Sequence, residues 1–280
     1  MTNEISKLEG MSNEKLMSFI GQAPSTKPMI ATLTTTKSGA MDDEKGNPIK
    51  GGLFLIEGTT HGIMIAETLF FRPLYSNYQY RKFDKDNNEN NCKSIMFGDS
   101  DWNAEKPDTN GTSACGSVPK KLRHTLDGVE AREQEKVKCN KNLWGLVTAK
   151  GVTLSGEEVS ITEEPMLYEA KGSNFMPLLE VIRGLSARNS VMSRCILEFY
   201  GTERRVYAEG GKNSSPYYVV KIKDTFKRKD LSDNDLQLIT KFRETEKVEN
   251  EYVMSKYKEK NKQKGDVLDD DIVAELESTK

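Results

Sequence analysis

Short apolar runs separated by glycine-bounded turns dominate the pattern of hydrophobic and polar positions near the start of the chain. Residues 53–56 and 63–66 flank the turn 58–62, and this spacing predicts two paired strands. The threonine-rich segment 30–36 predicts a strand before them. Residues 70–83 are also rich in strand formers, but Pro73 argues against a regular central strand there.

The second half of the chain shows further alternation of apolar and polar positions. Trp144 lies in the first of these segments, and apolar and polar residues alternate on both sides of it. We expect strands at 139–150, with a turn at Lys150 and Gly151, at 193–200, at 203–207 and at 217–226.

Two segments have the spacing of helices. Residues 175–185 place three apolar side chains on one stripe and predict a short amphipathic helix against a sheet. Ser232 followed by Asp235 resembles a capping box and predicts the start of a long helix. The apolar stripe of this helix thins beyond Glu244, so we expect it to leave the core there.

Periodicity is lost between residues 84 and 138, where prolines and glycines follow at short intervals. More than 50 residues without clear elements are too many for an ordinary loop, which predicts an inserted subdomain. We divide the chain into an N-terminal arm (1–29), a core (30–230) that carries this insertion, a C-terminal helix (231–264) and a tail (265–280). The expected fold is mainly β, an OB-like barrel with helical additions and α+β overall.

Charge is distributed unevenly along the 280 residues. The formal net charge is −2, but the last 15 residues hold six acids and one lysine, which leaves +3 on the rest. A modestly basic body with an acidic tail suits a nucleic-acid binder. No apolar run approaches the roughly 18 residues of a membrane span, and the first 16 residues lack the apolar core of a signal peptide, so we expect a cytoplasmic protein without a membrane partner.

Residues 70–83 bring together six of the 20 phenylalanines and tyrosines with three cations. Aromatic rings stack on unpaired bases at about 1 to 3 kcal/mol per base, while cations neutralise the phosphates between them. The alternative interpretation is a tyrosine-rich edge strand with half-buried rings. The candidate phosphate contacts are Arg72, Arg81, Lys82, Lys120, Lys121, Arg123, Lys221 and Lys223, and the candidate stacking residues are Tyr75, Tyr78, Tyr80, Phe83, Trp144 and Tyr217.

The four cysteines are too few and too widely spaced for a secreted disulfide framework. Cys92, Cys115 and Cys139 fall in one turn-rich region with His124 among them, so these residues are candidate ligands of a structural zinc ion. The alternative is that they are ordinary structural thiols. No other cofactor is expected.

Enzyme motifs are absent from the sequence. It contains no GxxxxGK[ST] phosphate loop, no GxGxxG, no HExxH and no GxSxG, and it has only two histidines. We therefore expect a protein that is not an enzyme. The acidic pairs at 157–158 and 163–164 leave a metal-dependent nucleic-acid-processing enzyme as an alternative.

The order of features resembles that of the single-stranded-DNA-binding replication proteins of bacteriophages. The shared features are FFRPLYSNYQYRKF, an insertion with DTNGTSACG and KCNKNLWGLV, the strand YYVVKIK, a C-terminal helix and an acidic end. The resemblance implies a protein that coats single-stranded DNA in replication, recombination or repair in the host cell cytoplasm. A phage assembly protein that uses the aromatic stretch as a protein interface is the first alternative, and homo-oligomers stay open.

The tail run Asp269, Asp270, Asp271 and Ile272 is similar to the acidic tips by which such proteins recruit replication partners. It differs from the bacterial form because it lacks a terminal Pro-Phe and continues for eight more residues. The resemblance implies replication proteins as partners of this tail.

Overall fold

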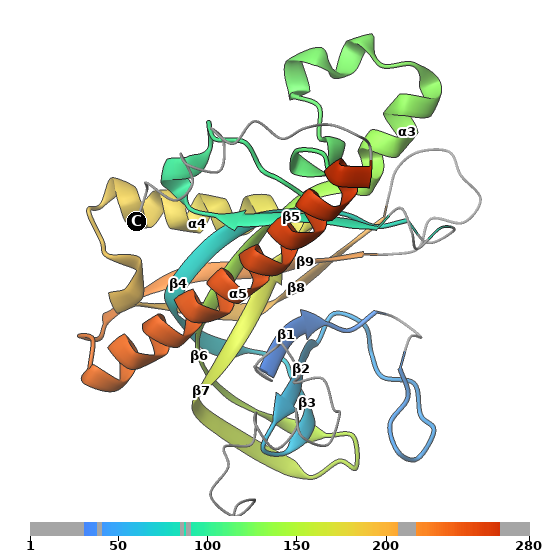
Figure 1. Cartoon of the computed structure of the whole chain (residues 1–280). Coiled ribbons are helices and arrows are strands. Elements are labelled where there is room, and N and C mark those ends of the chain that lie inside the picture. The colour runs from blue at the N-terminus through green and yellow to red at the C-terminus, as the bar shows by residue number, and fades with distance from the viewer. Residues whose placement is uncertain (1–30, 38–40, 85–86, 88–90, 207–216, 264–280) are drawn as a thin grey trace, which may run out of the picture.

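The protein is a mixed α+β structure built on one nine-stranded sheet (Figure 1). The computed structural model describes residues 31–37, 41–84, 87, 91–206 and 217–263. The strands are β1 (Ala31–Thr35), β2 (Phe54–Thr59), β3 (Gly62–Ala66), β4 (Leu69–Lys82), β5 (Cys92–Phe97), β6 (Val137–Thr153), β7 (Glu158–Ala170), β8 (Cys195–Arg205) and β9 (Tyr217–Arg228), and the α-helices in these ranges are α3 (Gly128–Lys136), α4 (Phe175–Ala187) and α5 (Asp233–Gln263). The expected N-terminal arm and the acidic tail, with Asp269, Asp270, Asp271 and Ile272, lie outside the described residues.

The strand order is β3-β2-β1-β7-β6-β4-β8-β9, with β5 beside β4. Strand β1 runs parallel to β7, and the other paired strands are antiparallel. Strand β3 also pairs with β6, so the pairings through β3, β2, β1, β7 and β6 return to their starting strand. A Cβ atom at Gly151 would lie 2.1 Å from the Ile65 carbonyl oxygen, so this pairing requires glycine. The prediction of a turn at Lys150 and Gly151 is wrong, because β6 continues through both residues.

Strand β4 is central, although it contains Pro73. Its 14 residues pair with β5, β6 and β8. The register against β6 shifts between Pro73 and Tyr75, and a bulge is a place where a strand tolerates proline. Opposite Pro73 lies Gly145, where a Cβ atom would come within 2.3 Å of the Arg72 carbonyl oxygen. The expectation that Pro73 prevents a central strand is thus wrong.

Several elements were not predicted from the pattern. Strand β7 carries glutamates and Pro165, and its backbone turns to a φ of +52° at Glu163, so it has no simple alternation. The insertion at 84–138 contains β5 and α3. The two short strands expected at 193–200 and 203–207 are one continuous strand, β8.

Helix α4 packs on the main hydrophobic core. Leu178 and Leu185 are fully buried, and Ile182 packs beside them, as the predicted stripe requires. The core beneath them contains Phe71 and Phe199, whose ring centroids are 5.7 Å apart. This packing leaves the outer surface of α4 exposed along β9.

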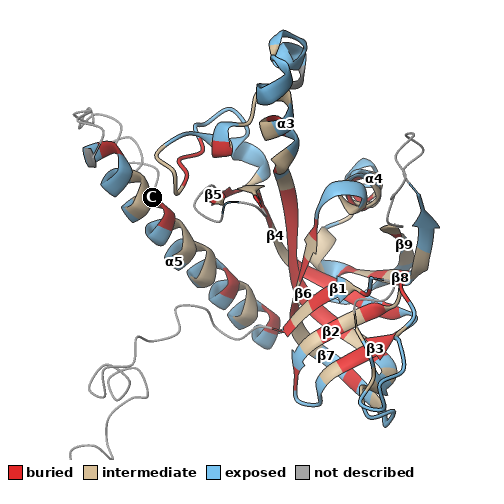
Figure 2. Ribbon diagram, turned by 90° about the vertical axis from the view of Figure 1, so that its right-hand side faces the viewer, coloured by how far each residue is buried: buried red, intermediate tan, exposed pale blue. Residues whose placement is uncertain are grey.

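Helix α5 crosses the part of the sheet that β4, β5 and β6 form. Phe242 is buried against Trp144, with ring centroids 5.5 Å apart. Figure 2 shows buried residues at intervals along α5, and Val253 near its far end is completely buried. The expectation that α5 leaves the core after Glu244 is therefore wrong.

The start of α5 is anchored by two sets of hydrogen bonds. The predicted capping box is confirmed, since the Ser232 amide donates to Asp235 (2.8 Å) and the Asp235 amide donates to the Ser232 hydroxyl (3.2 Å). The Arg72 guanidinium also donates to both carboxylate oxygens of Asp235, at 2.6 and 2.9 Å. Burial by itself raises the pKa of Asp235, but the bonds from Arg72 and Ser232 outweigh it and lower the pKa to about 2.

Replacement of Asp235 by Asn should lower the free energy of unfolding at neutral pH by about 3 kcal/mol, because it leaves the Arg72 charge buried without its partner. The folded pKa lies below the ordinary value of 3.8, so the wild-type contribution is present above about pH 4 and is lost as the pH falls toward 2. Urea unfolding at several pH values checks both effects. Asp233→Asn, at an exposed position on the same turn, is the control and should cost less than about 1 kcal/mol; equal losses would contradict the prediction.

Candidate nucleic-acid interface

Most of the aromatic stretch of β4 lies inside the molecule, although Phe70 is 42% exposed. Tyr78 is 4% exposed, with its ring centroid 5.6 Å from that of Phe97 and 4.8 Å from that of Trp102. The Lys141 ammonium lies 3.6 Å from the centroid of the Tyr78 ring, a cation–π contact. Tyr80 stacks on the same Phe97 ring at 5.9 Å. These tyrosines hold the insertion against the sheet and do not present free ring faces to a base.

The other candidates near β4 are occupied by helix α5 or by carboxylates. Arg72 is buried against Asp235, Tyr75 donates a hydrogen bond to Glu246, and Trp144 packs under α5. Arg81 pairs with Glu169, and Lys82 pairs with Glu133, both at 2.8 Å. Phe83, which is 61% exposed, is the candidate of this stretch whose ring faces solvent most. The alternative of a strand with buried rings describes this stretch better, although β4 is not an edge strand.

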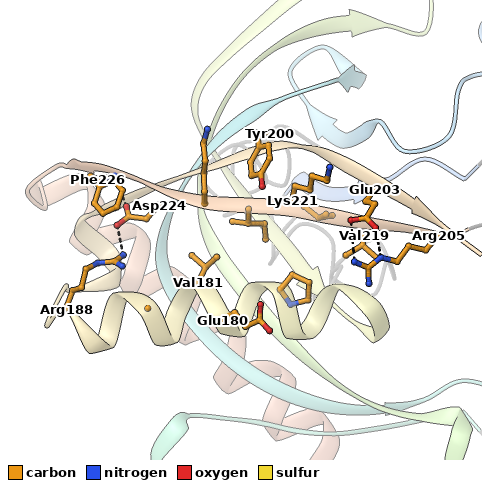
Figure 3. A pocket seen from close by; sticks show the side chains of 15 residues that line it. Glu180, Val181, Arg188, Tyr200, Glu203, Arg205, Val219, Lys221, Asp224 and Phe226 are labelled. Carbon is orange, nitrogen blue, oxygen red and sulfur yellow. Dashed lines mark hydrogen bonds and ion pairs between the residues drawn. The ribbon is translucent and has the colours of Figure 1, made fainter.

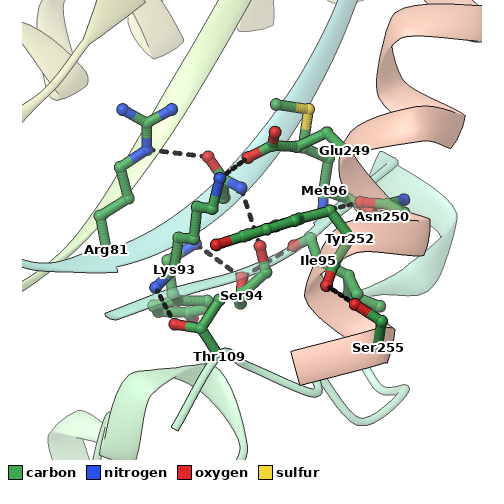
Figure 4. A network of polar contacts seen from close by, with 12 residues as sticks. Arg81, Lys93, Ser94, Ile95, Met96, Thr109, Glu249, Asn250, Tyr252 and Ser255 are labelled. Carbon is green, nitrogen blue, oxygen red and sulfur yellow. Dashed lines mark hydrogen bonds and ion pairs between the residues drawn. The ribbon is translucent and has the colours of Figure 1, made fainter. Parts of the chain in front are cut away.

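The edge of the sheet at β5 is covered by α5 (Figure 4). The Asn250 side chain pairs with the Met96 backbone, accepting from its amide at 2.6 Å and donating to its carbonyl at 3.0 Å. Lys93 donates to Glu249 at 2.5 Å and lies 4.5 Å from the Tyr252 ring centroid. The Asn250 side chain thus satisfies backbone groups of β5 that a neighbouring strand would otherwise pair with. Sequence reasoning missed this contact, because a single asparagine in a charged helix carries no signal of it.

The basic cluster of the insertion is exposed. Lys121 and Arg123 lie in a short 3₁₀ helix (Lys120–Thr125), and the side chain of Lys120 is outside the described part of the structure. Beside it is a groove of about 480 Å³ with Arg123, Lys138, Phe175 and Cys139 in its lining. Lys121 and Arg123 therefore remain available to a phosphate.

A second groove, of about 600 Å³, runs between β9 and α4 (Figure 3). Val181 and Glu180 enter it from α4, and Tyr200 and Lys221 lie on the side of β9 away from the helix. We call the exposed residues of β8, β9 and α4 around this groove the β9 surface. It contains the predicted residues Lys221 and Lys223 and lies at the end of the strand order, where β9 pairs with β8.

Two exposed rings on the β9 surface each have a cation beside one face. Tyr200 is 43% exposed, and the Lys223 ammonium lies 4.9 Å from its ring centroid. Phe226 is 71% exposed, and the Arg188 guanidinium lies 5.3 Å from its ring centroid. Tyr217, which we also predicted as a stacking residue, is half-buried at the start of β9. Sequence reasoning missed Tyr200 and Phe226 because they are isolated from the aromatic cluster of β4.

The backbone holds Phe226 in an unfavourable conformation. Its φ is +60°, a region that bulky residues rarely adopt. The Phe226 amide donates to the Asp224 carboxylate at 2.9 Å, and Asp224 also accepts from Arg188 at 2.9 Å. Strained residues of this kind concentrate at functional sites.

The segment that carries this surface is more basic than the chain as a whole. Residues 175–230 contain 11 lysines and arginines and 6 aspartates and glutamates, a net charge of +5 against −2 for the whole protein. Acids are interspersed, and Glu198 pairs with Lys223 at 3.1 Å. The net field is attractive to a polyanion.

The cysteines are only partly arranged as predicted. Cys92 and Cys115 are close together, but the third potential ligand beside them is Asp108. Cys139 lies in β6 opposite Tyr80, where burial raises the pKa of its thiol to about 12. Within the described ranges this is the one group of three or more potential metal ligands, and it includes neither Cys139 nor His124.

Comparison of the chain with models of protein families, with curated proteins and with solved structures finds no match. In the described ranges, no helix combines the length and the apolar character needed to cross a membrane.

Tyr78→Ala should lower the free energy of unfolding by about 3 to 5 kcal/mol, because it removes a buried ring and leaves the Lys141 ammonium without its aromatic contact. Chemical denaturation followed by circular dichroism measures this loss. Phe83→Ala, at an exposed position directly after the same strand, should change stability by less than about 1 kcal/mol. A Tyr78→Ala variant as stable as Phe83→Ala would show that the tyrosine is not a packing residue.

Proposed function

We propose that the protein binds single-stranded DNA, without strong sequence preference, through the β9 surface. Tyr200 and Phe226 act as stacking residues, and Lys221, Lys223 and Arg188 contact phosphates. The observation that carries the proposal is the pair of exposed rings, each next to a cation, on a segment with net charge +5. Rings provide affinity for any base, since every base has a π-face, and cations provide affinity for the backbone.

The groove between β9 and α4 lies on one side of β9, whereas Tyr200 and Lys221 lie on the other side of the strand. The lining of the groove contains apolar groups, such as Val181 and Val219, and charged ones, such as Arg205. A single strand can place unstacked bases over the rings and its phosphates along the cations, whereas a rigid duplex keeps its base faces stacked and out of reach. The surface is therefore expected to favour single strands.

We also propose a relation to a known fold and a cellular process in which the protein acts. We infer that the strand ring β3-β2-β1-β7-β6 is related to an OB-like barrel, and that the protein acts in phage DNA replication, recombination or repair in the host cell cytoplasm. The exposed cluster with Lys121 and Arg123 extends the basic surface onto the insertion. The tail from Asp269 to Ile272 recruits replication proteins.

Removal of the two rings should weaken binding while preserving the fold. Phe226→Asn keeps a residue that tolerates positive φ, so stability is retained or raised while the stacking ring is lost. Phe226→Asn and Tyr200→Ala should each weaken binding roughly 5- to 150-fold, from about 1 to 3 kcal/mol per stacked base. Anisotropy of a labelled oligo-dT at fixed salt is the measurement.

Phe83→Ala is the matched control for the rings, because Phe83 is an exposed aromatic outside the β9 surface. Equal binding by wild type and by the double variant Tyr200→Ala, Phe226→Asn would reject the proposed site. If Phe83→Ala weakens binding as much as Tyr200→Ala or Phe226→Asn does, the binding site is not confined to the β9 surface.

Charge reversal at Lys221 and Lys223 should lower both the affinity for oligo-dT and its salt dependence. Each phosphate contact contributes about 0.7 to the slope of log affinity against log salt concentration for single strands, so the double variant should lose roughly 1.4. Reversal of Lys241 and Lys258, two exposed lysines of α5, changes the net charge equally and is the control. A slope that changes equally in both variants would indicate a net-charge effect.

Two other functions would give different results in the same experiments. An assembly protein would form large oligomers without DNA, which sedimentation detects. A metal-dependent nuclease would convert labelled DNA to shorter products with magnesium or manganese, and chelator would abolish the conversion.

A further inference from the structure

A buried cluster of potential metal ligands lies within the insertion, between β5 and the loop that follows it. Cys92 lies at the start of β5, and Asp108 and Cys115 lie in the loop that follows β5. All three are buried, and their ligand atoms all lie within 4.8 Å of one another. Thiolate and carboxylate donors at this spacing are close to what one ion requires, since ligands at about 2.0 to 2.3 Å in a tetrahedron are roughly 3.3 to 3.8 Å apart.

The Tyr80 carbonyl oxygen, which accepts a hydrogen bond from the Cys115 thiol, is the candidate fourth donor. It lies 3.6 Å from the Cys115 sulfur, which is within the range for two ligands of one tetrahedral ion. The register between β4 and β5 is irregular at this point, and the Tyr80 amide donates to the Ser94 side chain at 3.0 Å instead of to a strand carbonyl. The amide and carbonyl of one strand residue point to the same side, so the Tyr80 carbonyl faces β5 and the loop that follows it.

The carboxylate of Asp108 is held in a fixed orientation. One oxygen accepts from the amides of Asn110 and Thr112, at 2.9 and 3.0 Å, and the other accepts from the Thr112 hydroxyl at 2.6 Å and the Cys115 amide at 2.8 Å. These four bonds occupy the roughly four lone-pair sites of the carboxylate, so ligation of an ion requires the Thr112 hydroxyl to turn away. The remaining bonds from backbone amides orient the carboxylate. Asp108 and Cys115 are thus linked directly.

The loop that presents Cys115 is strained. Ala114, Cys115 and Gly116 have φ values of +51°, +55° and +73°, and the first two are not glycine. Such residues cost about 1 to 3 kcal/mol each and persist where the surroundings impose them. The strained turn brings the Cys115 thiol to the Cys92 thiol.

We propose that Cys92, Cys115, Asp108 and the Tyr80 carbonyl form a structural zinc site that fastens the loop after β5 to β5 and to the neighbouring strand β4. Two thiolates select zinc over magnesium or calcium, and four protein donors in a buried place make a closed site. This ligand set replaces the Cys92, Cys115 and Cys139 set predicted from the sequence. The inference does not depend on the proposed DNA binding, because its readout is the metal itself.

Metal analysis of the full chain, purified under reducing conditions and incubated with zinc before dialysis, tests the site. Wild type and Cys139→Ser should each hold about one zinc per chain, whereas Cys92→Ser and Cys115→Ser should lose at least nine-tenths of it. Asp108→Asn should weaken zinc binding at least 10-fold. Cobalt in place of zinc should give thiolate charge-transfer absorption in wild type and Cys139→Ser only.

A second measurement on wild type alone keeps the test decisive if a variant does not fold. Zinc should raise the midpoint of thermal unfolding, and chelator should lower it, because the ion binds the folded state. Wild type without zinc, without cobalt absorption and with an unchanged midpoint would overturn the proposal. Equal loss of zinc in Cys139→Ser would also overturn it, in favour of a three-cysteine site.

Discussion

The buried ion pair between Arg72 and Asp235 is the interaction on which the arrangement of the rest depends. Both side chains are almost fully buried, at 4% and 1% exposure, and the guanidinium holds both carboxylate oxygens. A buried charge is tolerated only with its partner, so the start of α5 has one acceptable position on β4. Asp235 also forms the capping box with Ser232, from the third position of the helix. The same side chain therefore both caps the start of α5 and holds that start against β4.

The position of α5 then determines what happens to the aromatic residues beneath and beyond it. From its anchored start the helix brings Phe242 onto Trp144 and Asn250 onto the backbone of Met96. The insertion and the start of α4 surround Tyr78 on the other side. Tyr75, Tyr78 and Tyr80 of β4 are therefore used for packing, whereas Tyr200 on β8 and Phe226 on β9 are exposed at the end of the strand order.

The insertion needs a different kind of support, because it buries little apolar surface of its own. One small cluster there contains Cys92, Cys115 and Val137, with Tyr80 packed against it. Segments with small cores commonly depend on a metal or a disulfide. The proposed zinc ion between β5 and the following loop would supply that support at the place where the strained turn and the buried Asp108 occur.

The sequence by itself determined the elements whose signals are local. A threonine-rich segment predicted β1, and short apolar runs around a glycine-bounded turn predicted β2 and β3. Alternation predicted β9, helical spacing predicted α4, and Ser232 with Asp235 predicted the start of α5. These signals depend on neighbours within a few residues, so they can be read from the chain. The exposed residues Lys221 and Lys223 of β9 were recovered in the same way.

Tertiary structure alone decided which of the predicted residues are available and which neighbours they have. Tyr75, Tyr78 and Trp144 have the composition of a binding surface, but burial is set by α5 and the insertion, which come from distant parts of the chain. Pro73 fits a central strand because Gly145, 72 residues later, leaves room for it. Asp108 joined the cysteines in place of Cys139 for the same reason: contact between residues far apart in sequence follows from packing, not from spacing.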